Sequence, residues 1–170
     1  MSAAVVVTLS GCASTPPLTI FGGLTNHCFE NRTTDDGFFA LVGITVTNDT
    51  DRSVILRDAH VITLDNATVT AMSAVPVPSA YSVFGVAPGG DLSTEQIDLW
   101  RDRQPIEGTV IGPRATAEIV VELHARDYTD YVGLRGLHVR YDDGWFSGTS
   151  VADAVVGFVP PWSHCGPHLD

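Results

Sequence analysis

The sequence predicts an all-β protein in which two antiparallel sheets pack against each other as a sandwich. Three observations predict this class: apolar side chains alternate with polar ones over many short runs, turn-forming residues separate these runs, and a single short stretch has helical spacing. An antiparallel sheet can bury one face and leave the other in water, which gives this alternation. We therefore expect about seven to nine strands, with one short helix or irregular loop insertion.

The first clear strand covers residues 38–47. One face carries only apolar side chains and the other carries threonines, which predicts a half-buried strand. A turn at 48–52 separates it from a second strand over 53–64. In the second strand Val54 and Leu56 share one phase, whereas Ala59 and Val61 take the opposite phase. We therefore expect a β-bulge near Arg57 and Asp58. The inward residues of the first strand are Phe38, Ala40, Val42, Ile44 and Val46.

The later strands show the same pattern. Residues 68–77 form a weaker strand, and residues 117–125 give the strongest alternation in the chain. In the latter, Glu118, Glu122 and His124 fall on the outward face, so we expect them in solvent. Further strands are expected over 131–141, 145–150 and 155–159. The first two of these flank Asp142-Asp143-Gly144, a turn whose glycine suits a positive φ angle.

The alternation stops in the long segment from Val75 to Pro113. Ser93 and Gln96 have the spacing of a capping box, which predicts a short helix over 93–103. Loops longer than about 12 to 15 residues in a compact domain are often functional. Four apolar residues here could anchor a partner protein. Alternatively, they fold back and cap the core. They are Tyr81, Phe84, Ile97 and Trp100.

Charge and motif content limit the function classes. Asp and Glu number 20 against nine basic residues, all of them arginines, which gives a formal net charge of -11 at pH 7. Such a surface repels a phosphate backbone, so we expect no nucleic-acid partner. The sequence lacks a nucleophile elbow, a zinc-protease motif and a phosphate-binding glycine loop. We therefore expect neither catalytic residues nor a cofactor.

The N-terminal residues resemble a bacterial lipoprotein signal peptide. A short apolar run, Ser2 to Leu9, leads into Leu9-Ser10-Gly11-Cys12, which resembles the lipobox that is cleaved before an acylated cysteine. The resemblance implies a signal over 1–11, lipidation at Cys12, a linker over 12–17 and a domain over 18–170. It also implies a lipid anchor on the extracytoplasmic face of the cell membrane. The alternative is a buried first strand that ends at Cys12 by chance.

The other two cysteines, Cys28 and Cys165, lie near opposite ends of the domain. Because an exported chain meets oxidising conditions, we predict a disulfide between them. His27, His164 and His168 would then come close together, and imidazoles could hold copper or zinc there. Alternatively, these histidines are merely exposed beside a structural disulfide.

A second set of candidate metal ligands combines His124 and Glu122 with His138, on strands that we expect to be neighbours. The alternative is that these side chains belong to solvated strand faces, as Arg140 does beside His138.

Several blocks carry a resemblance to known proteins. VTNDTDRSVILRDAHVI, from Val46 to Ile62, resembles the opening hairpin of small immunoglobulin-like modules of bacterial envelope proteins. The blocks W..R.P..G.VI.P, AEIVVELHA and LRGLHVRYDDG are similar to uncharacterised lipoproteins of high-GC actinobacteria, and the lysine-free composition fits such a genome. The resemblance implies an immunoglobulin-like sandwich and carries over no catalytic residue.

Together these features predict a lipid-anchored binding or structural module of the bacterial cell envelope, acting by protein–protein interaction with another envelope protein or complex. The alternative is a small copper- or zinc-binding envelope lipoprotein that uses the histidines beside Cys28 and Cys165.

Overall fold

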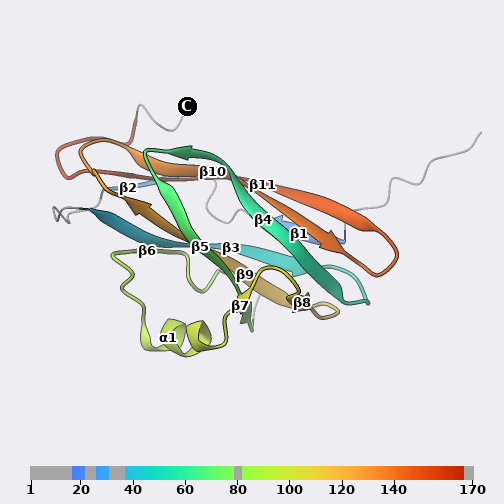
Figure 1. Cartoon of the computed structure of the whole chain (residues 1–170). Helices are drawn as coiled ribbons and strands as arrows, with labels where there is room; N and C mark the ends of the chain where they lie inside the picture. Colours follow the sequence, from blue (N-terminus) through green and yellow to red (C-terminus); the bar gives the residue numbers. More distant parts are fainter. Residues whose placement is uncertain (1–16, 22–25, 31–36, 79–81, 167–170) are drawn as a thin grey trace, which may run out of the picture.

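The computed structural model describes residues 17–21, 26–30, 37–78 and 82–166. It confirms the two-sheet β-sandwich with one short helix (Figure 1). The described residues form eleven strands, more than the seven to nine expected from the sequence. The excess comes from short strands that a sequence pattern cannot show, since two to four residues have no detectable alternation. The expected signal over 1–11 and Cys12 lie outside the described residues.

One sheet, here called sheet A, contains six strands. Its order is β1 (Leu18–Phe21), β3 (Phe38–Asn48), β9 (Thr116–Ala125), β5 (Thr68–Val77) and β7 (Gln104–Pro105). The sixth strand, β6 (Val86–Pro88), also pairs with β3. All these pairs are antiparallel.

The other sheet, sheet B, contains five strands. Its order is β2 (His27–Glu30), β11 (Ser147–Val159), β10 (Val132–Asp142), β4 (Val54–Asp65) and β8 (Val110–Ile111). The pair β2 and β11 is parallel, which corrects the expectation of purely antiparallel sheets. The predicted strands 145–150 and 155–159 are one continuous strand, β11.

The strand order confirms the immunoglobulin-like topology. Sheet A contains β1, β3, β9 and β5 in the order of strands A, B, E and D of a constant-type immunoglobulin domain. Sheet B contains β4, β10 and β11 in the order of strands C, F and G. The segment between β5 and β9 is an insertion into this plan. We call residues 82–103 the insertion.

The core lies between the two sheets, where the alternating positions of both meet. Every inward residue predicted for β3 and for β9 is buried. The predicted bulge is also confirmed, because the pairing of β4 with β10 shifts register between Asp58 and Leu56. Gly136 of β10 has a φ of 69°, and a second register shift occurs there against β11. A positive φ is accessible to glycine without strain.

Sheet A is covered on its outer face as well. The insertion packs across it with the helix α1 (Thr94–Arg101), which lies on the side away from sheet B (Figure 1). The strand β3 is therefore buried on both faces, which corrects the half-buried strand that its alternation predicted. A second small apolar cluster fills this contact, with Leu41, Val75, Phe84, Ala87 and Val120 as its buried members.

The helix α1 confirms the predicted capping box. Ser93 accepts a hydrogen bond from the backbone N–H of Gln96, and the Gln96 side chain accepts one from the backbone N–H of Ser93. Gln96 also donates to the carbonyl of Val83 at 2.9 Å. The same glutamine thus begins the helix and fixes it to the start of the insertion.

Candidate functional site

The predicted disulfide is present. Cys28 on β2 and Cys165 after β11 are joined, with their Cα atoms 5.7 Å apart. His27 stacks on Phe29, and His164 Nδ1 lies 3.7 Å from Glu30 Oε1 in an exposed position. The third histidine of this predicted cluster, His168, lies outside the described residues. Within the described ranges, no three His, Cys, Asp or Glu side chains gather in a way that could hold a metal ion.

The second predicted set of metal ligands is wrong about which strands are neighbours. His124 and Glu122 are on β9 in sheet A, whereas His138 is on β10 in sheet B. His138 instead pairs across the sheet with His60, and their ring centroids are 4.6 Å apart. His60 stands alone in the sequence pattern, so only the pairing of β4 with β10 reveals this contact.

The apolar residues of the insertion divide between the two alternatives. Phe84 is buried and cannot contact a partner as predicted, because it packs beneath the ring of Trp100, with centroids 5.8 Å apart. Trp100 is itself half-buried and has the guanidinium of Arg103 4.8 Å from its ring centre. Ile97 is exposed on α1. Tyr81 is outside the described part of the chain.

Glu118 corrects the expectation of a solvated carboxylate on β9. It is fully buried beneath the insertion. Its two oxygens accept hydrogen bonds from the backbone N–H groups of Val83 and Phe84, the second at 2.9 Å. Burial raises the pKa of the Glu118 carboxyl, and these two backbone donors act in the opposite direction. The carboxylate therefore holds the insertion against sheet A rather than facing solvent.

The outer face of sheet B is open, in contrast to that of sheet A. We call its centre the sheet B face and define it by His60, Ile62, His138 and Val151. Ile62 is 54% exposed and Val151 is 58% exposed, although both lie in the middle of long strands. Val151 pairs with His138, which pairs with His60, so one row crosses β11, β10 and β4. An ion pair between Arg140 and Asp58, at 3.4 Å, borders this row.

The hairpin between β10 and β11 carries the two most exposed large apolar side chains among the described residues. Trp145 is 75% exposed and Phe146 is 74% exposed, and we call this pair the aromatic tip. The sequence pattern assigns both residues to a strand, but the structure places them in the turn. Their signal in the sequence is the two aromatic residues directly after Asp142-Asp143-Gly144, a position that a turn leaves in solvent.

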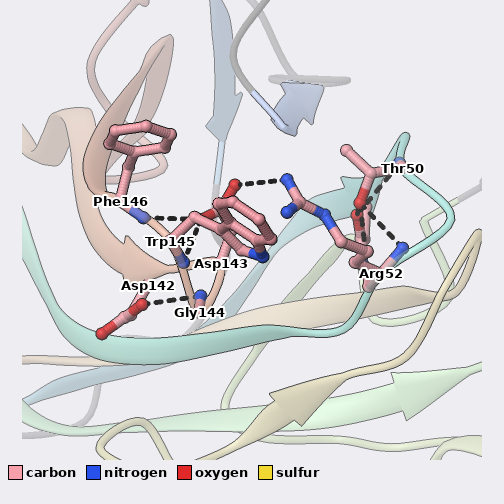
Figure 2. Close-up of polar contacts among 8 residues, drawn as sticks. Thr50, Arg52, Asp142, Asp143, Gly144, Trp145 and Phe146 are labelled. Atoms are coloured by element: carbon pink, nitrogen blue, oxygen red, sulfur yellow. Dashed lines mark hydrogen bonds and ion pairs between the residues drawn. The ribbon is translucent and has the colours of Figure 1, made fainter.

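The tip is held by its own aspartates (Figure 2). Asp143 accepts hydrogen bonds from the backbone N–H groups of Trp145 at 2.9 Å and Phe146 at 2.8 Å. Asp142 accepts one from Gly144 at 2.8 Å. These donors hold the pKa of each carboxyl below its ordinary value. The backbone of the turn is thus fixed while both aromatic side chains remain about three-quarters exposed.

A second contact joins the tip to the neighbouring loop 49–53. Arg52 donates to the Asp143 carboxylate at 3.0 Å, and its guanidinium lies 5.6 Å from the centre of the Trp145 ring (Figure 2). A guanidinium at this distance from an indole is attracted by the ring quadrupole. Both contacts fix the orientation of the tip relative to the sandwich.

A recess with a volume of about 730 Å³ lies at the other end of the sandwich and is lined mainly by polar residues. It lies between β5, β9 and the loop after β9. His124, Asp127 and Asp130 line it. It is open to solvent, and its lining lacks the predominantly apolar and aromatic side chains of a typical ligand pocket.

Comparison with known proteins leaves the family open. No protein-family model matches the chain, and no curated protein matches its sequence. The described residues contain no helix with the length and apolar character needed to cross a bilayer.

Proposed function

We propose that this protein is a lipid-anchored extracytoplasmic module of the bacterial cell envelope that acts by binding another envelope protein through the sheet B face. The observation that carries the proposal is the asymmetry of the sandwich. Sheet A is covered on its outer face by the chain's own insertion, whereas sheet B leaves Ile62 and Val151 more than half exposed in the middle of its outer face.

The composition of the sheet B face supports a protein partner. Protein interfaces have an apolar or aromatic centre with polar groups around it. Here two β-branched side chains and two imidazoles form the centre, and the Arg140 and Asp58 pair lies beside them. The strands beneath are long and rigidly paired, so this surface binds without paying for the ordering of a loop.

The lipobox-like sequence that ends at Cys12 supports the location of the module. Several acyl chains would hold it on the membrane surface without any transmembrane helix. The disulfide between Cys28 and Cys165 supports an oxidising compartment, where such bonds persist. Metal binding by the histidines near this disulfide has no supporting cluster among the described residues, so a metal-binding function is not proposed.

The test is photo-crosslinking in native membranes, with a photoreactive amino acid placed at Val151. We expect one discrete crosslinked species. The variant Ile62→Arg abolishes it, because an unpaired charge at the centre of an interface is costly. The matched control is Ile97→Arg, which replaces an isoleucine that is exposed to a similar degree on the other side of the sandwich. No crosslink at Val151, or an equal loss with both variants, would refute a protein partner at this face.

A further inference from the structure

We propose that the aromatic tip is a second membrane contact, which inserts Trp145 and Phe146 into the bilayer interface and sets the orientation of the domain. This inference rests on the lipid anchor at Cys12 that the proposed function includes. It does not depend on the protein partner of the sheet B face. It follows from where the chain enters the sandwich, how far the linker can reach and which side chains are exposed at that end.

The chain enters the sandwich beside the tip. The backbone carbonyl of Pro17 accepts a hydrogen bond from the backbone N–H of Asp49 at 3.0 Å. Asp49 belongs to the loop 49–53, which the ion pair between Arg52 and Asp143 joins to the hairpin. The carbonyl of Leu18 accepts one from the Ser150 hydroxyl at 2.8 Å. Ser150 lies on β11, four residues after Phe146, so Leu18 is about 13 Å along the strand from the tip. Figure 1 shows the β10–β11 hairpin and the β3–β4 turn together at one end of the sandwich.

The linker is short enough to restrict which end can face the membrane. From Cys12 to Leu18 the chain spans at most about 20 Å when fully extended. With the tip toward the bilayer, Leu18 stands about 13 Å above it, which the linker reaches easily. With the opposite end down, Leu18 stands the length of β11 from Ser150 to Val159 above the bilayer, about 30 Å. The linker cannot reach that far, so the end that carries Cys165 and Trp162 cannot face the membrane.

The side chains at the tip fit a bilayer interface. Trp is enriched where membrane meets water, because its ring is apolar and its N–H can face the headgroups. Trp145 and Phe146 are adjacent and about three-quarters exposed, and Val110 on β8, which pairs with the first residues of β4, is 56% exposed. The backbone of the tip is fixed by Asp143, so insertion requires no ordering of the turn.

Three of the four carboxylates at this end are paired with arginines, although the whole chain is acidic; the fourth, Asp49, accepts a hydrogen bond from the Thr19 hydroxyl. Anionic lipid repels a protein with a formal net charge of -11. At the tip end, Asp143 pairs with Arg52, Asp142 pairs with Arg57, and Asp51 pairs with Arg114. Three of the nine arginines thus neutralise carboxylates here. This end is therefore repelled less by the bilayer surface than the average surface of the protein.

The test uses the full-length acylated protein in vesicles of phosphatidylcholine with a minority of phosphatidylglycerol. A single introduced cysteine carries an environment-sensitive fluorophore, at Phe146→Cys in one protein and at Trp162→Cys in the matched control. We expect a blue-shifted emission at position 146 that lipid-attached quenchers suppress, and neither effect at position 162. Equal and weak quenching at both positions would overturn the proposal.

A second variant separates insertion of the tip from insertion of the dye. The fluorophore is placed at Ser53→Cys, an exposed position in the loop beside the tip. We expect lipid quenching there, and its loss in the double variant W145A/F146A. Quenching that persists in the double variant would contradict a role for the aromatic rings. Intact mass spectrometry and vesicle flotation detect acylation of Cys12 independently of the fluorescence quenching. An unacylated chain would refute both the anchor and this inference, whereas acylation without tip quenching would refute this inference alone.

Discussion

Replacing Glu118 by glutamine tests how the insertion is held on sheet A. Glu118 accepts one backbone N–H on each carboxylate oxygen, from Val83 and from Phe84. A glutamine offers one oxygen, and its NH₂ group faces the second donor. A buried donor without a partner costs about 1 to 3 kcal/mol, and removing a buried charge offsets part of that cost. We therefore expect Glu118→Gln to lower the free energy of unfolding by about 1 to 2 kcal/mol.

The assay is urea denaturation at neutral pH, together with hydrogen exchange of the Val83 and Phe84 amides. For a chain of this size the expected loss corresponds to a fall in Tm of about 2 to 8 °C. The matched control is Glu122→Gln, four residues along the same strand and half-exposed, which we expect to leave both quantities unchanged. Unchanged stability and exchange in Glu118→Gln would refute the contact as the attachment of the insertion.

The difference in stability between wild type and Glu118→Gln depends on pH in a predictable direction. Because the pKa of Glu118 is raised in the fold, the folded state binds its proton more tightly than the unfolded state does. The stabilisation that comes from protonating Glu118 is complete below its ordinary pKa of 4.5 and is lost as pH rises through the raised pKa of the folded state. Glutamine does not titrate. The stability difference between wild type and Glu118→Gln therefore narrows as pH rises from acid to neutral, and a difference that widens would contradict the burial of this carboxyl.

Three further predictions concern packing, the disulfide and the hairpin. Gly43→Ala lowers the free energy of unfolding in urea denaturation by about 1 to 3 kcal/mol, because a Cβ at this position would lie 2.8 Å from the Cβ of the buried Phe84. The control Gly112→Ala leaves stability unchanged, because the nearest atom to its Cβ would be 3.8 Å away. Replacing Cys28 and Cys165 by serine lowers the calorimetric Tm, because closing 137 residues constrains the unfolded chain by about 5 kcal/mol in the entropic model; an unchanged Tm would contradict it. The pKa of Asp143 is lowered in the fold. The stabilisation from its ionised carboxylate is therefore present above the ordinary pKa of 3.8 and is lost as pH falls through the lowered pKa of the folded state. Amide NMR signals of the turn therefore shift in acid before the core unfolds, and simultaneous loss of both would argue against this local role.

Much of the sandwich could be predicted from local patterns. The phases of β3 and β9, the change of phase in β4 and the capping box at Ser93 each depend on a few neighbouring residues, and the structure confirms all of them. The disulfide between Cys28 and Cys165 could be predicted because few pairings were open. Such features survive folding because side-chain alternation and capping follow from backbone geometry alone.

The candidate binding surfaces could not be predicted in this way. His60 and His138 meet only because β4 pairs with β10, and the two strands are far apart in sequence. Trp145 and Phe146 continue an apolar pattern, so they read as strand until the aspartate contacts place them in the turn. The histidine pair has no local signal in the sequence, and the only local signal of the aromatic tip is the Asp142-Asp143-Gly144 turn that precedes it.

The sequence by itself determined which strand faces are apolar, where the helix starts and which cysteines pair. The tertiary structure alone decided what covers each face. The carboxylate of Glu118 occupies a polar position of the β9 pattern, yet the insertion buries it, because alternation records the chemistry of a face and not its neighbours. The position of Leu18 beside the aromatic tip likewise depends on tertiary contacts. It follows from the pairing of β1 with β3 and from the hydrogen bond between Leu18 and Ser150 on β11, which join residues far apart in the sequence.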